Sequence, residues 1–424
     1  MKRELLASEG GIPTIKNSFP IYKSIGDEEI RAANKVLHSG VLSGFIAANG
    51  EGFLGGPEVN LLENEACKLF NVNHVISVNS WTSGLIAAVG AIGVNPGDEI
   101  IVTPWTMVAT ATAILHWNAI PVFCDIDPYT FNIDPSKIEK LISPKTKAIL
   151  SVDIFGQSCD MKSLRGIADK YNLKLISDTA QAPGAKTNND FAGTQADIGG
   201  FSLNYHKHIN CGEGGLLVTN NNDFAHRLRL IRNHGEAVIK TDNKNELNNI
   251  IGYNFRLGEI EAAFTREQLK KLPELIKNKQ KIANDLYSGL SGLGGLKLPK
   301  IAKNSTHVFY IFGMILDIKN LKKDRDWIFK NLTAEGVPGL LNGYQNIHLN
   351  PIFINKIAYG NDGFPWKGLK DNISNRSYSL GLCPIAEELH LKSFLGINLC
   401  AHFYNEEEIK LVIKAFKKVW SHLI

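Results

Sequence analysis

The sequence lacks any apolar run that approaches the ~18 residues a membrane-spanning helix requires. Its opening stretch, MKRELLASEGG, has basic residues but only a two-leucine apolar run, unlike a secretory signal peptide. It also lacks a paired cysteine pattern, because its six cysteines lie far apart and none belongs to a CxxC motif. Such spacing favours reduced thiols. We therefore expect a cytoplasmic protein with no membrane partner.

A large net charge is also missing. Lysine and arginine number 46 and aspartate and glutamate 42, so the balance is +4 over 424 residues, and we expect no nucleic-acid partner. Hydrophobic residues make up 44% of the chain and charged residues 21%, which excludes a mostly disordered protein and is ordinary for one with a large core. The length fits two or three compact units.

Short apolar runs alternate with helical stretches from about residue 62 to residue 219. Each run is nearly continuous in apolar residues, which is typical of a strand buried on both faces. The alternation predicts an α/β fold with a mainly parallel sheet and helices on both of its faces. The expected strands cover residues 74–78, 99–103, 120–124, 148–154, 173–177, 198–203 and 215–219, and the expected helices among them cover 82–93, 106–117 and 161–171.

The pattern changes after about residue 258. A long charged helical pattern over 259–290 contains Pro273, which we expect to kink or break the helix. The last helix is expected to begin after Asn405, a good N-cap residue followed by three glutamates. We therefore expect a large domain at residues 1–270 and a smaller C-terminal α/β domain at residues 271–424.

Four motifs place chemically useful side chains near the ends of the expected strands. The stretch NSWTSG at 79–84 opens a helix and offers hydroxyl and N–H groups to an anion. Asp178 ends a strand, where ligands bind in open parallel sheets. Lys207 lies between a strand and a glycine-rich turn, where partial burial would favour attack of its amine on an aldehyde. The stretch 252–259 opens the long helix with further anion-binding groups.

Each motif alone also has an ordinary structural explanation as a helix cap, a surface lysine or a loop. His206 and His208 flank Lys207, but no acidic or cysteine partner stands at ligand spacing, so we expect no metal site. Together, however, the motifs supply a phosphate cradle, a carboxylate for a cationic ring nitrogen and a lysine for a Schiff base. These are the parts that pyridoxal 5′-phosphate needs.

Longer blocks of the chain resemble the DegT/DnrJ/EryC1/StrS family of pyridoxal-phosphate sugar aminotransferases, from about residue 26 to residue 420. The resemblance implies the type I aminotransferase fold, with a mainly parallel seven-stranded sheet in the large domain. The matching blocks include GGPEVNLLENE (55–65), PVFCDIDPYTFNID (121–134), ISDTAQAPGA (176–185), GGFSLNYHKHINCGEGGLLVT (199–219), IRNHGE (231–236) and GYNFRLGEIEAA (252–263).

The resemblance also implies a role for each matching residue. Lys207 is implied to form the Schiff base with the cofactor and to carry the proton between the cofactor's 4′ carbon and the substrate carbon. Asp178 is implied to pair with the pyridine nitrogen, and Gln181 to hydrogen-bond the ring hydroxyl. Asn254 resembles a phosphate ligand contributed across the interface of a homodimer. The implied phosphate ligands within one subunit are Thr82, Ser83 and Ser202.

Some positions depart from the family pattern or vary within it. Trp81 stands where the family usually has glycine, so it is a candidate to line the substrate pocket or simply to pack. Where an aromatic ring usually covers the cofactor, this chain has Met107, and a sulfur–aromatic contact is favourable by roughly 0.3–1.5 kcal/mol. Trp105 is the competing candidate for that position. His348, in the loop 342–350, is a further candidate for contact with the substrate.

The lysine at position 207 favours transamination, since a dehydratase branch of the family carries histidine there. The resemblance implies glutamate as the amino donor and the keto group of a nucleotide-linked deoxy sugar as the acceptor, in amino-sugar and surface-polysaccharide biosynthesis. Two alternatives stay open. One is a cyclitol aminotransferase that acts on a keto-inositol with glutamine as donor, and the other is a non-catalytic regulatory member of the family.

Overall fold

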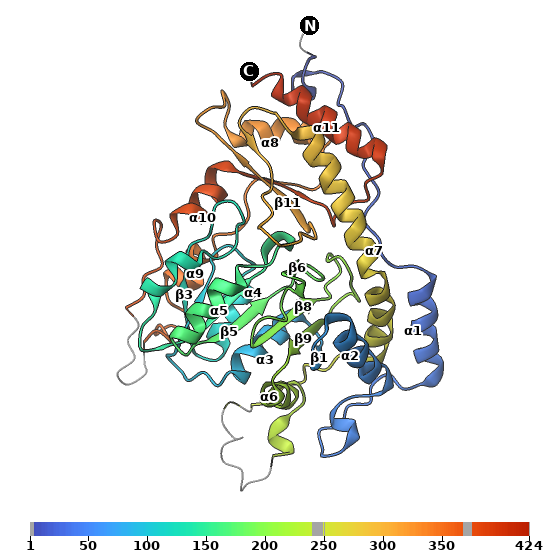
Figure 1. The fold of residues 1–424 in the computed structure, drawn as a ribbon, viewed down its shortest axis with the longest axis vertical. Coiled ribbons are helices and arrows are strands. Elements are labelled where there is room, and N and C mark those ends of the chain that lie inside the picture. The colour runs from blue at the N-terminus through green and yellow to red at the C-terminus, as the bar shows by residue number, and fades with distance from the viewer. Residues whose placement is uncertain (1–3, 240–248, 250, 368–374, 424) are drawn as a thin grey trace.

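The computed structural model describes residues 4–239, 249, 251–367 and 375–423. Its centre is a seven-stranded sheet with the strand order β1-β9-β8-β5-β4-β2-β3 (Figure 1). All neighbours from β8 to β3 pair in parallel, whereas β9 runs antiparallel to both β8 and β1. The strands are β1 (His74–Val78), β2 (Glu99–Val102), β3 (Ile120–Phe123), β4 (Thr146–Val152), β5 (Lys174–Asp178), β8 (Ile198–Ser202) and β9 (Gly215–Thr219).

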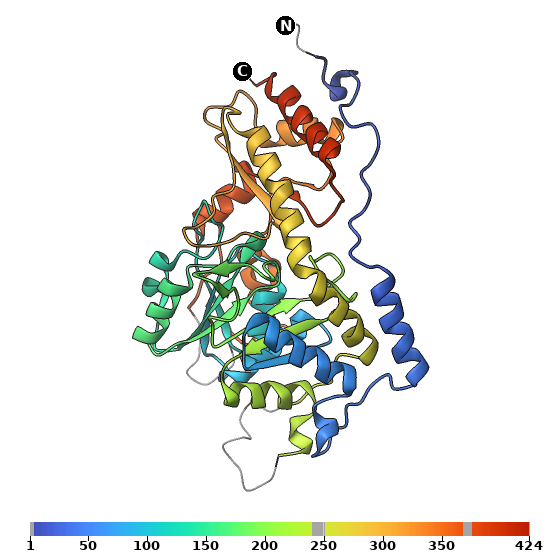
Figure 2. The ribbon, with the colours of Figure 1, turned by 45° about the vertical axis from the view of Figure 1, so that its right-hand side comes forward.

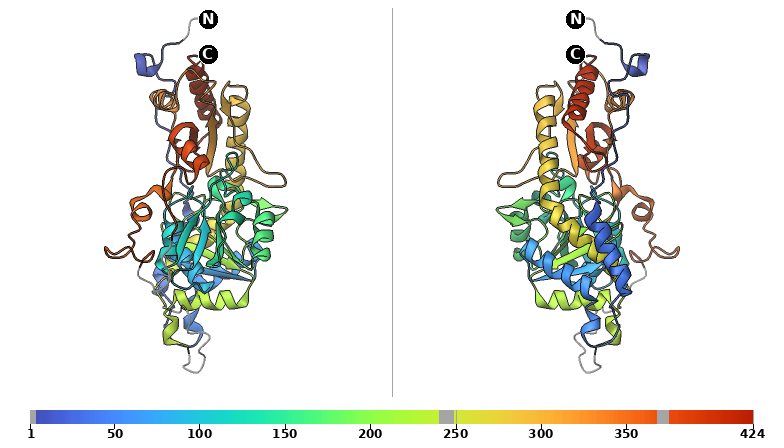
Figure 3. Two further views of the ribbon diagram at one scale, coloured as in Figure 1. Left: turned by 90° about the vertical axis from the view of Figure 1, so that its left-hand side faces the viewer. Right: turned by 90° about the vertical axis from the view of Figure 1, so that its right-hand side faces the viewer.

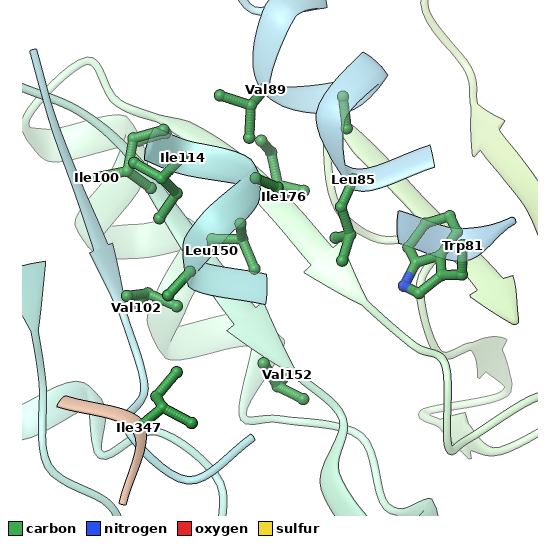
Figure 4. Packing of buried hydrophobic residues seen from close by; sticks show 14 of the residues in the cluster. Trp81, Leu85, Val89, Ile100, Val102, Ile114, Leu150, Val152, Ile176 and Ile347 are labelled. Carbon is green, nitrogen blue, oxygen red and sulfur yellow. The ribbon is translucent and has the colours of Figure 1, made fainter. Parts of the chain in front are cut away.

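The expected mainly parallel α/β fold is therefore confirmed, and each strand lies within two residues of its expected place. The strands are apolar on both faces because helices cover both faces. Figure 4 shows one of these interfaces, where Leu85 and Val89 of α3 lie beside sheet residues such as Ile176 and Leu150. The helices that pack here are α3 (Trp81–Ala91), α4 (Ala109–His116) and α6 (Asn222–Arg232).

The opposite face of the sheet uses the alternate strand positions. Val75, Phe201 and Leu216 pack with α2 (Pro57–Phe70) and the first half of α7 (Glu259–Leu290). Ile101 packs with α5 (Met161–Lys170). This alternation follows from the period of two in a strand. The shorter elements are α1 (Asp27–Ser39), α9 (Pro351–Ile354), α10 (Pro384–Glu388) and the hairpin strands β6 (Lys186–Thr187) and β7 (Asp190–Phe191).

A second, four-stranded antiparallel sheet forms the C-terminal part, above the large sheet in the side views of Figure 3. Its strands, in spatial order, are β10 (Leu296–Lys297), β11 (Ile311–Leu316), β13 (Phe394–Asn398) and β12 (Leu340–Leu341), and it packs with α8 (Arg325–Ala334) and α11 (Glu406–Trp420). As predicted, Asn405 caps α11, and Glu408 returns the bond to the backbone of Asn405.

The N-terminal segment packs with this C-terminal part, and both termini lie at the same end of the molecule (Figures 1 and 2). Leu6, Ile15 and Phe19 belong to the same core cluster as Phe416 and Trp420. The expected division at residue 270 assigns these N-terminal residues to the large domain. In the structure, however, they pack in the core of the small C-terminal part. The division itself stays a prediction.

The longest helix, α7 (Glu259–Leu290), joins the two parts (Figure 2). Leu272 packs in the core below the large sheet, and Leu286 in the core of the small one. The expectation that Pro273 breaks this helix is wrong, since α7 continues through it as one element. Proline removes only one backbone donor, and buried residues on both sides hold the adjoining turns. No helix among the described residues is long and apolar enough to cross a bilayer.

Candidate active site

The carboxyl ends of β1, β5 and β8 meet at one edge of the large sheet, where the antiparallel β9 begins. Gly215, the first residue of β9, pairs with both Val78 and Ser202. A cavity of about 150 Å³ opens at this edge. The predicted site residues that line it are Trp81, Thr82, Met107, Asp178, Gln181, Ser202 and Lys207.

A larger cavity, of about 710 Å³, lies beside α5 and the loop around Asn304. It contains none of the predicted site residues, all of which the structure describes. Its carboxylates already serve local structure: Asp160 caps α5, and Asp127 accepts bonds from the backbone of Tyr129 and Thr130. The smaller cavity is therefore the candidate active site, because it combines a buried amine with a buried carboxylate.

Lys207 presents its amine to this cavity from the turn that follows β8. Its backbone N–H donates to Asn204 O at 3.0 Å, and its side chain is 7% exposed. The Nζ atom lies 4.5 Å from the ring centroid of Tyr310. Burial lowers the pKa of Lys207 to about 8, although the negative charge of Asp178 acts in the opposite direction. About a tenth of this amine is therefore neutral at pH 7, far more than for an exposed lysine, and the neutral amine is the form that attacks an aldehyde.

Asp178 ends β5 with its carboxylate buried and fully engaged. Its Oδ1 accepts from Trp81 Nε1 at 2.7 Å and from Ala180 N at 3.2 Å, and its Oδ2 accepts from Thr110 Oγ1 at 2.8 Å. Burial raises the pKa of Asp178, while the bonds from Thr110 and Trp81 and the charge of Lys207 act to lower it. These donors stabilise the anion in a place that water does not reach.

The N-terminus of α3 forms the anion-binding end of the cavity. Ser80 caps the helix, since its Oγ accepts from Ser83 N at 3.0 Å, and Thr82 is exposed in the first turn. A helix N-terminus with hydroxyl side chains attracts phosphate. Ser202 also lines the cavity, and its Oγ accepts from Asn204 N at 3.3 Å.

Ser83 was expected to hold the phosphate, but the structure places its side chain elsewhere. Its hydroxyl lies 2.9 Å from Ser80 Oγ, the side chain is 8% exposed, and the residue does not contribute to the cavity lining. Ser80 lines the cavity instead. The capping contacts turn the side chain of Ser83 toward Ser80, and its role at the phosphate stays a prediction.

Gln181 lines the cavity with its amide held at both ends. Its Oε1 accepts from Phe155 N at 2.9 Å and its Nε2 donates to Tyr344 OH at 2.9 Å. One N–H of the amide remains for a ligand, so the bond to the cofactor hydroxyl stays a prediction. Burial raises the pKa of Tyr344 to about 12, which keeps this phenol protonated.

Met107 and Trp105, the two candidates for covering the cofactor ring, lie in different surroundings. Met107 lines the cavity and is 56% exposed. Trp105 is fully buried, and its ring stacks with Phe131 and packs edge-on against Phe394. The indole of Trp105 belongs to the aromatic core and does not line the cavity, so Met107 is the better placed of the two candidates. The role of Met107 stays a prediction.

His348 is likewise buried rather than presented to a substrate. Its exposure is 0%, and its Nε2 lies 2.9 Å from Glu387 Oε1. The same carboxylate accepts from the backbone N–H groups of Gly381 and Cys383. His348 thus anchors the segment before α10, and its contact with a substrate stays a prediction.

Asn254 lies outside the cavity of its own chain. Its Oδ1 accepts from Arg256 Nε at 2.7 Å, and its backbone oxygen accepts from Asn79 Nδ2 at 3.3 Å. Its contribution to a second subunit stays a prediction. The two histidines beside the lysine also differ: His206 lines the cavity, whereas His208 is fully buried and bonded to Val308 O. No group of three potential metal ligands occurs among the described residues.

Sequence reasoning missed several residues of the lining. Thr106 and Thr110 stand four residues apart near the start of α4, with their hydroxyls 2.9 Å from each other, and Thr110 continues the chain of bonds to Asp178. Their spacing in a helix that follows a strand end was the available signal. The other missed lining residues include Ser80, Asn204, His206 and Glu213.

The chemistry of this lining fits pyridoxal 5′-phosphate. Asp178 is a buried carboxyl group whose donors are neutral, so a cationic ring nitrogen would stabilise its charged form. Lys207 offers an amine of lowered pKa for the aldehyde, and the α3 N-terminus offers donors for the phosphate. These three groups surround one cavity and match the three polar ends of the cofactor.

Comparisons with known proteins identify a family and relatives that this chain resembles. The profile of the DegT/DnrJ/EryC1/StrS aminotransferase family matches residues 24–392. The spore coat polysaccharide biosynthesis protein SpsC of Bacillus subtilis (strain 168) is 31% identical over 366 residues, which cover 85% of this chain and 90% of that protein. The dTDP-3-amino-3,4,6-trideoxy-alpha-D-glucose transaminase of Streptomyces venezuelae is 32% identical and covers 78% of this chain and 82% of its own. An aminotransferase structure from Psychrobacter cryohalolentis has a TM-score of 0.80 at 27% identity and covers 96% of this chain and 99% of its own.

Proposed function

Because the chain belongs to the DegT/DnrJ/EryC1/StrS aminotransferase family, we propose that it transfers an amino group from glutamate to the keto group of a nucleotide-linked deoxy sugar. The chain is an aminotransferase, and its cofactor is pyridoxal 5′-phosphate. The observation that carries the proposal is the buried amine of Lys207, which shares a cavity with Asp178 at the carboxyl edge of the sheet.

The residues of the cavity have distinct tasks in this reaction. Bound pyridoxal 5′-phosphate supplies an aldehyde that links to amines and a ring that takes up the electron pair of a substrate C–H bond. In the half-reaction with the donor, the Nζ atom of Lys207 accepts the proton from the substrate carbon and would deliver it to the 4′ carbon of the bound cofactor. The half-reaction with the acceptor runs this transfer in reverse, and the lowered pKa of Lys207 suits both directions. Asp178 stays anionic and holds a proton on the ring nitrogen, supported by its bonds from Thr110 and Trp81.

The acceptor is inferred from the relatives. One acts in spore coat polysaccharide biosynthesis, and another is a transaminase of a dTDP-linked amino sugar. Both names support a sugar acceptor, and the second supports a nucleotide carrier. The free, widely spaced cysteines support a cytoplasmic location, where nucleotide sugars are made.

We also propose a homodimer in which Asn254 completes the phosphate site of the partner subunit. Two features support it. Asn254 lies outside the cavity of its own chain, and the segment from α1 to α2 carries exposed apolar side chains that a second copy would cover. These side chains are Ile30, Leu37, Val41, Leu42, Ile46, Leu54 and Leu61, each at least 40% exposed.

The proposed reaction is tested with the purified holoenzyme and two sets of substrates. Glutamate is offered with a panel of nucleotide-linked 3-keto and 4-keto deoxy sugars, and glutamine is offered with a keto-inositol. Mass spectrometry should detect an aminated nucleotide sugar and 2-oxoglutarate in the first set only. Amination of the keto-inositol would favour the cyclitol alternative, and no turnover of any amino donor would favour a non-catalytic role.

A further inference from the structure

Trp81 occupies the position where the family pattern has glycine, and its side chain has a definite place in this fold. It is the first residue of α3, it is 6% exposed, and its Nε1 donates to Asp178 Oδ1 at 2.7 Å. Figure 4 shows the ring beside Leu85, with its indole nitrogen on the side that faces the other labelled residues. The indole is therefore buried against the carboxylate that faces the cofactor.

Two glycines leave the room that this ring fills. A Cβ added to Gly200 of β8 would lie 2.4 Å from the ring atoms Cη2 and Cζ3, and one added to Gly84 of α3 would lie 2.7 Å from Cε3. The ring is thus seated between the sheet and the next turn of its own helix. Because neither side leaves room for rotation, the direction of the N–H bond is fixed toward Asp178.

The hydrogen bond has a physical consequence for Asp178. An indole N–H only donates and does not ionise at ordinary pH, so it stabilises the carboxylate more than the protonated carboxyl, which is the weaker acceptor. Bonds to a charged acceptor are stronger than neutral ones, and Asp178 is 4% exposed, so water cannot replace this donor. Thr110 is also a donor to Asp178, but its hydroxyl can rotate and accept as well.

We propose that Trp81 is a positioning residue that orients Asp178 and keeps it anionic, so that Asp178 can hold the proton on the cofactor ring nitrogen. This role rests on the proposed function only in requiring the cofactor and the half-reaction with glutamate. The proposed role of Trp81 does not depend on the identity of the sugar acceptor. The competing explanation is that Trp81 only fills the space left by Gly84 and Gly200.

A double-mutant cycle separates the two explanations. Trp81→Phe keeps an aromatic ring between the glycines but removes the N–H, and Asp178→Asn removes the carboxylate charge. Both are made alone and together in the holoenzyme, and two quantities are measured: the rate of the glutamate half-reaction and the pH midpoint of the visible absorbance of the bound cofactor. The second quantity reports the charge around the cofactor and does not depend on turnover.

If Trp81 acts through Asp178, W81F lowers the half-reaction rate about tenfold or more. It also moves the absorbance midpoint in the same direction as D178N, and it adds no further effect in the D178N background. If W81F leaves both quantities unchanged, or lowers the rate equally in both backgrounds without moving the midpoint, the proposal is overturned. If W81F folds poorly, benzothienylalanine can be introduced at position 81 instead, since it replaces only the N–H of the indole by sulfur. The same rate and absorbance midpoint are then measured.

Trp117 provides a matched control. It is 8% exposed, its Nε1 donates to Ile86 O at 2.7 Å, and its ring fills the space above Gly90, yet it lies outside the cavity. Trp117→Phe removes the same N–H from a buried tryptophan and should leave the absorbance midpoint unchanged. Failure of the proposed sugar acceptor would appear only in the second half-reaction, so it cannot be confused with failure of this proposal.

Discussion

At the scale of single residues, the chemistry of the site depends on how burial and charge act on the amine of Lys207. Burial favours the neutral amine, and the nearby Asp178 favours the ammonium form. The first effect is the larger one, and it places the pKa at about 8. An exposed lysine, with a pKa of about 10.4, would be almost entirely protonated at neutral pH.

This balance predicts the pH dependence of cofactor capture. Only the neutral amine attacks the aldehyde, so the capture rate should rise with pH and reach half of its maximum near pH 8. Asp178→Asn removes the charge that raises the pKa of Lys207, so its midpoint should move to lower pH. The measurement is stopped-flow absorbance after mixing cofactor-free protein with pyridoxal 5′-phosphate between pH 6 and pH 11.

Lys207→Ala is the control for this experiment, since it should abolish both the absorbance change and all turnover. A midpoint near that of an ordinary lysine would contradict the lowered pKa. A full absorbance change in K207A would contradict the assignment of the amine itself.

Sequence reasoning succeeds at this scale where a residue's role follows from its place in a motif. Lys207 and Asp178 follow strands, and their places at the sheet edge could be predicted. The sequence could not decide between Ser80 and Ser83, because the choice depends on a hydrogen bond between the two hydroxyls. Nor could it foresee that Glu387, thirty-nine residues away, would bind His348 in the core.

At the scale of elements, the site depends on a buried ion pair that joins two helices and a strand. Arg232 of α6 is fully buried, and its guanidinium donates to Glu63 of α2 and to the backbone oxygens of Ser77 in β1 and Leu54. These contacts hold the N-terminal segment and α2 against the strand that leads into α3. The arginine therefore fixes elements that carry the phosphate end of the cavity.

Removing this arginine should destabilise the protein strongly. Arg232→Met keeps much of the apolar volume but leaves Glu63 buried without its cationic partner, which typically costs about 3–5 kcal/mol. Denaturant unfolding should show this loss in the free energy of unfolding. The double variant with Glu63→Gln should recover part of it, because no uncompensated charge then remains. A loss below about 1 kcal/mol in R232M would mean that Glu63 is stabilised by other groups.

Local sequence patterns predict the individual strands and helices better than they predict how these elements continue and pack together. The seven strands of the large sheet and the start of α11 could be predicted because buried strands and N-caps leave short-range signals. The course of α7 through Pro273 could not, since packing against two separate cores overrides the local preference. For the same reason, the position of Leu6 in the small core has no local signal.

At the scale of the whole molecule, one chain has a cofactor cavity but holds Asn254 outside it. The resemblance to the family implies that this side chain serves the phosphate site of a second subunit, as we propose above. Exposed apolar side chains from α1 to α2 would become buried in such an assembly, and α1 packs directly on α7, which begins shortly after Asn254. The surface that would form the dimer is thus continuous with the segment that would complete the site.

Subunit complementation tests this arrangement. Lys207→Ala and Asn254→Ala are each expected to be nearly inactive as homodimers. If Asn254 contributes to the active site of the partner subunit, a mixed dimer has one cavity that carries both substitutions and one cavity that carries neither. Random exchange of subunits makes about half of the dimers mixed, so the mixture should regain about a quarter of the wild-type activity. A mixture of K207A with the K207A/N254A double variant is the control and should stay inactive. If mass spectrometry detects mixed dimers but no activity returns, Asn254 acts in its own subunit or in no active site. The proposal of an active site shared between subunits would then be wrong.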